Sequence, residues 1–180
     1  YNIARKYNPN AKVFISLTHY WNWTSNPYFY HSRELLEQLL DFSKAEGNFE
    51  WAIAQHPYPE SLREPKVWLD EKVSFDFDTP LITFKNTEVL DAWVKQPEVL
   101  YKGKKRTVYL SENGTNSPTY SEQDLKEQAA GLAYALKKIK YLDGIDGFQY
   151  HNWQDNRGEG GLRIGLRPFP DAEEDPGGKK

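Results

Sequence analysis

The residue with the clearest chemical meaning is Glu112, within the run Ser111-Glu112-Asn113-Gly114. This four-residue run directly follows residues 106–110, a short and largely apolar stretch that predicts a buried strand. In parallel α/β barrels, catalytic groups stand at the carboxyl ends of strands, where they face the ligand. A glutamate in that place can be a nucleophile, a general base, a metal ligand or a satisfied structural acid, so the rest of the chain must decide between these roles.

Histidines follow three other apolar runs, which predict strands over residues 12–17, 49–54 and 147–150. Aromatic and acidic side chains stand close to them in the sequence. The accompanying set is His19, Trp21, His56, Tyr58, His151, Trp153 and Asp155. Four strand ends with such side chains predict one shared mouth for a ligand.

The predicted strands alternate with predicted helices, and this alternation is typical of a parallel sheet. The helices are expected over residues 33–45 after a Ser32 cap, 87–94 after Thr87, and 122–140 after Ser121. Residues 60–86 form a long irregular stretch, which in a compact domain is usually functional. Open sheets of the Rossmann type and barrels both fit this order. No glycine-rich phosphate loop follows any strand, which favours a barrel.

Composition excludes several classes of protein. The chain has 180 residues and a net charge of -3, with no basic stripe for nucleic acid and no polybasic run for a membrane. It has no cysteine, so thiol nucleophiles, thiolate metal sites and disulfides are excluded. Six tryptophans and twelve tyrosines accompany a mean hydropathy of -0.81, a composition that suits a ligand-facing aromatic surface or a core filled by large rings.

Together, the strand ends resemble strands five to eight of the clan A retaining glycoside hydrolases, which are (β/α)8 barrels. More narrowly, residues 1–170 are similar to an uncharacterised bacterial domain family within that superfamily. The matching segments are Lys44-Ala45-Glu46-Gly47 leading to Trp51, His56-Pro57-Tyr58-Pro59, residues 77–86, Ser111-Glu112-Asn113-Gly114, and Tyr150-His151-Asn152-Trp153-Gln154-Asp155.

The resemblance implies a role for each matching residue. Glu112 would be the catalytic nucleophile, Tyr58 would donate a hydrogen bond that holds this carboxylate ionised, and Trp153 would lie under the sugar at the point of cleavage. The same carbohydrate pocket would be lined by His19, Trp21, His56, Asn113, His151 and Asp155. The resemblance implies no metal and no cofactor, and it implies secretion or a periplasmic location.

One departure from the family pattern is large. The clan carries its acid/base glutamate at the end of strand four, whereas this sequence begins in the helix that follows. We therefore expect an α/β fold that is a partial (β/α)8 barrel, strands five to eight, truncated at both ends. Residues 1–167 would be its C-terminal half and residues 168–180 a flexible tail. Because the sequence has no methionine, we expect that Tyr1 is not a translation start. The partners expected are a carbohydrate and the missing N-terminal half, without which the fragment would be inactive.

Two other functions fit the same residues. Metal-dependent amidohydrolase barrels also place histidines after strands five and six and an aspartate after strand eight. The histidines His19, His56 and His151, each after a different strand, together with Asp155 could therefore hold zinc. A barrel with an aromatic mouth could also bind carbohydrate without cleaving it. Each of these residues could also have a purely structural role. Tyr58 and Trp153 could be packing residues, and Asp155 could cap a turn.

Overall fold

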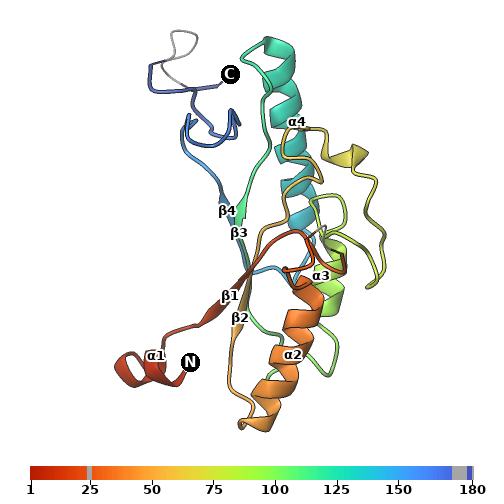
Figure 1. The fold of residues 1–180 in the computed structure, drawn as a ribbon, viewed down its shortest axis with the longest axis vertical. Coiled ribbons are helices and arrows are strands. Elements are labelled where there is room, and N and C mark those ends of the chain that lie inside the picture. The colour runs from red at the N-terminus through yellow and green to blue at the C-terminus, as the bar shows by residue number, and fades with distance from the viewer. Residues whose placement is uncertain (24–25, 172–177, 180) are drawn as a thin grey trace.

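The computed structural model describes residues 1–23, 26–171 and 178–179. Its centre is a sheet of four parallel strands, whose order in space equals their order in the sequence (Figure 1). The strands are β1 Phe14–Leu17, β2 Ala52–Gln55, β3 Val108–Asn113 and β4 Gly147–Tyr150. Each overlaps its predicted run, and β3 continues past the predicted end to include Glu112. The expected α/β architecture with a parallel sheet is confirmed.

One helix precedes the first strand, and the helices between successive strands cover one face of the sheet. The helices are α1 Asn2–Tyr7, α2 Ser32–Ala45, the short 3-10 helix η1 Val67–Leu69, α3 Glu88–Trp93 and α4 Glu122–Ile139. Figure 1 shows α2, α3 and α4 on the same side of the strands, with α1 apart from them near the amino end of β1. Within the described residues, the other face of the sheet has no helical layer, and we call it the open face.

Only one of the three expected helix caps has the predicted geometry. Ser121 accepts a hydrogen bond from the backbone nitrogen of Asp124 at 3.2 Å and so caps α4. Ser32 is instead the first residue of α2, where its buried hydroxyl donates to the carbonyl of Thr18. Thr87 likewise donates to the carbonyl of Thr83. Both hydroxyls satisfy a neighbouring carbonyl, which competes with capping when the residue is buried.

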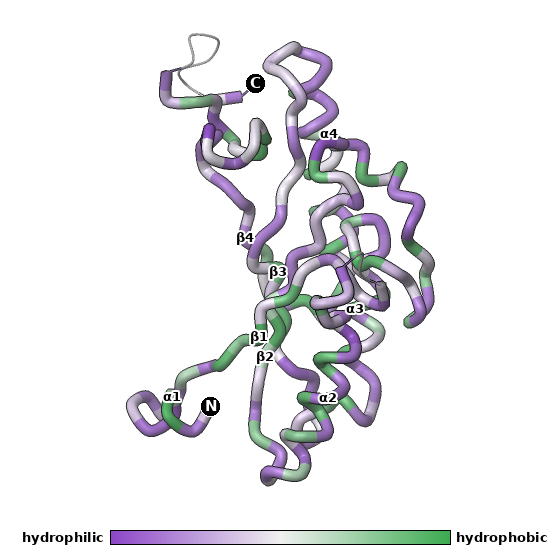
Figure 2. Tube along the Cα trace, in the orientation of Figure 1, coloured by the Kyte–Doolittle hydropathy of each residue, from purple (hydrophilic) through white to green (hydrophobic). Residues whose placement is uncertain are grey.

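The hydrophobic core lies between the sheet and its helices. Leu17, Ile53 and Leu110 point from the strands toward the helical side, where they pack with residues such as Leu36 of α2 and Leu90 of α3. Figure 2 shows the same arrangement as green hydrophobic segments along the strands and an alternation of green and purple along α2. Because one sheet face is buried, the side chains of alternate strand residues must point to the open face.

The open face combines rings with small residues. Phe14 of β1 and Tyr109 of β3 bring their rings to a centroid distance of 5.1 Å, across the intervening strand β2. Gly147 lies beside Tyr109, and a Cβ added there would lie 3.1 Å from its ring. Ser16 and Gln149 are exposed on their strands. A partly apolar sheet face without a covering layer is typical of a surface that meets a ligand or more polypeptide.

The long segment between β2 and α3 is held by one buried amide. Asn86 donates from Nδ2 to the carbonyls of Ser74 and Leu81 and to Oγ1 of Thr79, and its Oδ1 accepts from the nitrogen of Thr83. These bonds satisfy backbone groups that have no strand or helix partner. The segment is therefore an organised wall of the domain.

The expected tail is described only in part. Phe169 is buried, and its ring packs against that of Tyr120 at 6.0 Å. Residues 172–177 and 180 of the expected tail lie outside the described residues, and the domain boundary at 167 stays a prediction. Over the described ranges, no helix combines the length and apolar character that crossing a membrane requires.

Arg106 is a fully buried cation at the amino end of β3. Its guanidinium lies 4.0 Å from the centroid of the Trp51 ring, and it donates to the carbonyls of Val99 and Phe49 and to Oδ1 of Asn48. A planar guanidinium can stack on a ring and donate at its edges at the same time, whereas an ammonium cannot. Arg106 therefore ties the start of β3 to the segment that precedes β2.

We expect Arg106→Lys to lower the free energy of unfolding by about 1–3 kcal/mol, because a single ammonium leaves buried acceptors without donors. Urea denaturation measures this change. Lys104→Gln alters an exposed charge two residues away and should stay within about 0.5 kcal/mol of the parent protein. Equal midpoints for the two variants would contradict the role of Arg106.

Candidate active site

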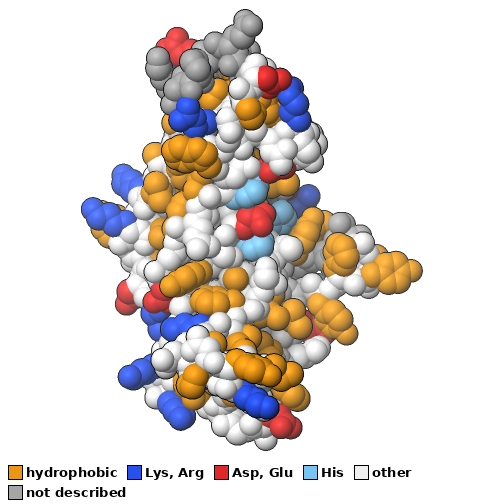
Figure 3. Space-filling view, turned by 90° about the vertical axis from the view of Figure 1, so that its left-hand side faces the viewer, with side chains coloured by type: hydrophobic (Ala, Val, Ile, Leu, Met, Phe, Trp, Pro, Cys, Tyr) orange, Lys and Arg blue, Asp and Glu red, His pale blue; other side chains and the backbone are white. Residues whose placement is uncertain are grey.

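The parallel register brings the predicted site residues to one edge of the sheet. Gln55 pairs with Leu110, and Asn113 pairs with Tyr150, so the carboxyl ends of β2, β3 and β4 are adjacent. His56, Glu112 and His151 therefore come together. Figure 3 looks onto the open face and shows pale-blue histidine side chains around a red acidic side chain near its centre. The shared mouth expected from the sequence is present for these three strands.

The pairing of β3 with β4 is interrupted beside Glu112. Leu110 pairs with Phe148 and Asn113 with Tyr150, so three steps on β3 oppose two on β4. Such a bulge changes the direction of the side chains within it. Nδ2 of Asn113 spans the interruption by donating to the carbonyls of Leu110 and Gln149, at 2.9 and 3.1 Å.

Asn113 is fully buried, and its amide holds the two strands together. The contact of Asn113 with a carbohydrate stays a prediction. Gly114 follows in an equally tight place. A Cβ at this position would lie 2.3 Å from Cγ2 of Ile164 and 2.4 Å from the carbonyl oxygen of His151, distances that no side chain can accept. The glycine of the motif is therefore required by close approach of the backbone after β4.

Glu112 is hydrogen-bonded to Tyr58. The phenol hydroxyl donates to Oε1 of Glu112 at 3.1 Å. Tyr58 is buried between Pro57 and Pro59, which are buried as well and fix the path of its backbone. Burial and the nearby carboxylate of Glu112 raise the pKa of Tyr58, so the phenol stays protonated and remains a donor. The Glu112 side chain is only partly buried and can still be reached from the open face.

His56 lies beside the same carboxylate. Its Nε2 is 3.4 Å from Oγ of Ser16, a residue of the open face. Burial lowers the pKa of His56, the charge of Glu112 raises it, and His151 lowers it. The net effect is a pKa below 6.5, so His56 is mainly neutral at pH 7 and can both donate and accept a hydrogen bond.

A second carboxylate, Glu159, belongs to this cluster although sequence reasoning missed it. Its Oε1 accepts from Nδ2 of Asn152 at 3.0 Å and lies 3.3 Å from Nε2 of His151. It is also close enough to Tyr58 to raise the pKa of that phenol. Glu159 lies in a glycine-rich turn eight residues after His151 and follows no strand directly, so strand-end reasoning could not find it.

His19 follows β1 and lies at the rim of the site. Its ring packs edge-on against Tyr20 at 4.5 Å, and burial lowers its pKa while Glu60 raises it. The described interactions of His19 are therefore a ring contact with Tyr20 and a charge interaction with Glu60. A direct contact of His19 with a ligand stays a prediction.

Two residues expected to line the pocket are buried in this structure. Trp21 is completely buried, donates from its indole nitrogen to the carbonyl of Phe77 and packs edge-on against Trp93. Asp155 is also buried, and its carboxylate accepts from Tyr120, from the nitrogen of Gly165 and from Lys179. Neither side chain can be reached by a ligand in this structure, because each is enclosed by its own partners.

Trp153 has the opposite environment. Its side chain is 68% exposed, and the guanidinium of Arg167 lies 5.8 Å from its ring centroid. A ring that is open on the ligand side of a barrel could stack on the apolar face of a sugar. The role expected for Trp153 stays a prediction that this exposure allows.

The metal-dependent alternative receives no support from the described residues, among which no group of three or more His, Asp or Glu side chains could hold a metal ion. Asp155, one of the residues that this alternative requires, is already paired with Lys179. The signature metal ligands of that class would lie before this sequence, so the histidines alone do not decide the question.

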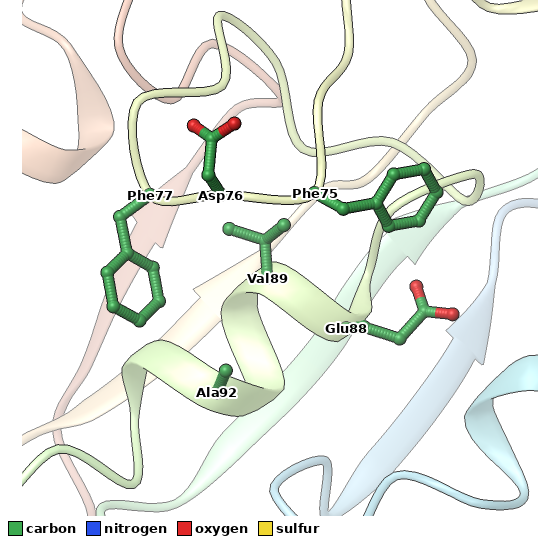
Figure 4. A pocket seen from close by; sticks show the side chains of 6 residues that line it. All are labelled: Phe75, Asp76, Phe77, Glu88, Val89 and Ala92. Atoms are coloured by element: carbon green, nitrogen blue, oxygen red, sulfur yellow. The ribbon is translucent and has the colours of Figure 1, made fainter.

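One hollow in the described surface lies away from these residues. A cavity of about 420 Å³ is lined by the loop residues Phe75, Asp76 and Phe77 and by Glu88, Val89 and Ala92 of α3. Figure 4 shows the two phenylalanine side chains on the loop that passes over α3, with the side chain of Val89 between them. This cavity belongs to the helical layer and contains none of the strand-end residues, so volume alone does not identify the site.

The fold is that of part of a glycoside hydrolase barrel. A β-glucosidase from Thermotoga maritima in complex with noeuromycin matches 93% of this chain with a TM-score of 0.53 and 13% identity, over 48% of its own length. The same enzyme with deoxynojirimycin gives a TM-score of 0.51 over 47% of its length. A family 39 glycoside hydrolase from Bacteroides cellulosilyticus WH2 is 21% identical over 73% of this chain and 26% of its own, with a TM-score of 0.47.

These likenesses show the fold alone, and the chain spans half or less of each of these structures. The chain itself belongs to the family of unknown function DUF5722, whose model matches residues 1–180. No curated protein matches it.

The electrostatic coupling of His56 can be tested by titration. We expect Glu112→Gln to lower the pKa of His56 further, because the carboxylate that favours the imidazolium is lost, and His151→Gln to raise it, because a repulsive neighbour is removed. NMR titration of the histidine ring protons measures both shifts. Glu122→Gln, on the exposed start of α4, should leave the pKa of His56 unchanged. Shifts of the same sign in the first two variants would refute the arrangement.

Proposed function

We propose that this chain provides the nucleophile half of a glycoside hydrolase that cleaves an O-glycosidic bond of a poly- or oligosaccharide with retention of configuration. The observation that carries the proposal is the partly exposed Glu112 carboxylate at the end of β3, which accepts a hydrogen bond from Tyr58 at 3.1 Å. The likeness in fold to β-glucosidases supports it, since carboxylates at barrel strand ends perform this chemistry.

The reaction would proceed in two displacements. Glu112 attacks the anomeric carbon while the bond from this carbon to the leaving oxygen breaks, and an acid group gives its proton to that oxygen. Water then attacks the same carbon, gives a proton to the conjugate base of the acid, and releases Glu112. Two inversions at one carbon give net retention. No metal or cofactor takes part in these steps.

The neighbours of Glu112 have distinct tasks in this mechanism. Tyr58 holds one carboxylate oxygen by its hydrogen bond, so that the other can point at the anomeric carbon. His56, mainly neutral at pH 7, can hydrogen-bond a sugar hydroxyl without adding charge next to the nucleophile. Glu159 holds Asn152 and His151, and thereby fixes the wall of the site after β4. Trp153 offers an exposed ring to the apolar face of the sugar.

The proton donor would come from polypeptide beyond this sequence. A retaining mechanism needs a second carboxyl group about 5–5.5 Å from the nucleophile. The chain spans 48% of the length of a whole barrel enzyme, and within the described residues its sheet has no layer on the open face. We propose that the rest of a barrel covers this face and that activity requires it.

The nucleophile can be trapped in the longest natural form of the protein that contains this chain. We expect one 2-deoxy-2-fluoro glycoside of a panel to add a single sugar, found by intact mass and mapped by peptide sequencing to Glu112, because fluorine slows hydrolysis of the intermediate. Glu112→Gln should form no adduct and lose at least about a thousandfold in turnover. Glu122→Gln should react like the parent protein. An adduct on another carboxylate would disprove the assignment.

Tyr58→Phe tests the hydrogen bond that positions Glu112. We expect kcat/KM for an aryl glycoside to fall by about ten- to a hundredfold, the equivalent of losing a hydrogen bond to a charged group. Tyr109→Phe removes another phenol hydroxyl from the same face of the sheet and should change kcat/KM less than about twofold. Steady-state kinetics of both variants measure the difference. Equal losses in the two would mean that Tyr58 has no special part in the reaction.

A further inference from the structure

Three consecutive aromatic side chains project into solvent after β1. Tyr28 is 90% exposed, Phe29 59% and Tyr30 66%. Tryptophan and tyrosine are common at binding surfaces because each ring combines a large apolar area with a polar tip. Three such rings in one exposed loop form a contiguous apolar patch, unlike the single exposed apolar residues that are normal on protein surfaces. None of these three residues belongs to the group that contacts Glu112.

A hollow of about 360 Å³ lies beside these rings. Its wall at the end of β1 is formed by Ser16, Thr18 and Tyr20, and the three rings of the loop complete it. Its remaining described lining residues, Leu17, Ser32 and Leu35, are also uncharged. Aromatic faces and hydroxyl groups without any lysine, arginine, aspartate or glutamate suit a neutral ligand that is itself rich in hydroxyls. They suit anionic or cationic ligands poorly.

One residue, Ser16, borders both the hollow and the candidate active site. Ser16 lines the hollow, and its Oγ lies 3.4 Å from Nε2 of His56. His56 in turn lies close enough to Glu112 for their charges to interact. A ligand that extends from Glu112 past His56 would therefore meet Ser16, which is part of the lining of the hollow.

We propose that Tyr28, Phe29 and Tyr30, together with Ser16 and Thr18, form a second sugar-binding subsite of the Glu112 site, which holds a further neutral sugar unit of an oligo- or polysaccharide. The proposal rests on the proposed function and narrows it to substrates of several neutral sugar units. The apolar face of a pyranose ring stacks on a tyrosine or phenylalanine ring, while its hydroxyls bond to the serine, threonine and tyrosine hydroxyls. The subsite adds binding energy away from the bond that breaks.

The experiment compares substrates of different length in the longest natural form of the protein that contains this chain. Its probes are neutral hexasaccharides (cellohexaose, laminarihexaose, xylohexaose and mannohexaose), the matching disaccharides, and an aryl monoglycoside. Binding is measured by calorimetry in the Glu112→Gln background and turnover in the parent background. The variants are Tyr28→Ala and Tyr30→Ala. Tyr141→Ala is the matched control, because Tyr141 is 75% exposed just beyond the end of α4.

We expect at least one hexasaccharide to bind more tightly than its disaccharide, and Tyr28→Ala or Tyr30→Ala to weaken hexasaccharide binding by about three- to tenfold. Hydrolysis of the aryl monoglycoside should be unchanged in these variants, and Tyr141→Ala should match the parent protein in every assay.

Three results would overturn the subsite. They are no binding of any hexasaccharide, equal binding by the loop and control variants, and a lowered melting temperature in the loop variants with unchanged sugar binding, which would mean that other polypeptide covers the patch. The proposed function fails separately: hexasaccharides that bind through Tyr28 and Tyr30 but are never cleaved would leave the subsite standing and reject the hydrolase.

Discussion

The amide of Asn113 is the interaction on which the geometry of the site depends. Strands β3 and β4 lose their regular register between Leu110 and Asn113, and this amide joins them across the gap by two hydrogen bonds. Without it, the buried carbonyl of Leu110 and the partly buried carbonyl of Gln149 would each lose this donor, and buried carbonyls are rarely left unpaired. The bulge and its amide together set the direction of Glu112, whose carboxylate accepts the hydrogen bond of Tyr58 and lies close to His56.

The two faces of the sheet have different roles in the protein. The helical side contains the apolar core, where residues such as Ile53 and Leu110 pack with α2 and α3. The open side carries polar groups that are held by other polar groups: Tyr58 by Glu112, and His151 and Asn152 by Glu159. Burial keeps His56 neutral and Tyr58 protonated, so the carboxylate of Glu112 meets donors without a neighbouring full positive charge from these two residues.

Much of this architecture follows from sequence patterns. Apolar runs of four to six residues located all four strands, and the amphipathic spacing of residues 122–139 located α4 with its serine cap. The position of Glu112 at a strand end also follows from the alternation of strands and helices, since parallel strands end at one edge. Its hydrogen bond with Tyr58 was expected only from the resemblance to clan A glycoside hydrolases. Local order along the chain is sufficient for these features.

The features that could not be predicted depend on tertiary partners. Trp21 and Asp155 have the residue types of a sugar site, but Trp93 and Lys179, distant in the sequence, enclose them in the core. Glu159 enters the site because its turn folds back toward Tyr58, and no local pattern marks such a return. Ser32 looks like a helix cap until the carbonyl of Thr18 is placed beside it.

Gly114 also limits how the protein could be redesigned. A methyl group at this position would collide with the backbone of His151 and with Ile164. The backbone just after Glu112 must therefore keep its close approach to the segment after β4, and no larger residue fits at Gly114. New specificities would therefore have to be selected or engineered in the loops around the mouth, and a mutant library directed at the motif itself would return mostly misfolded protein. The loop after β1, with its exposed rings, is the most permissive starting point for such changes.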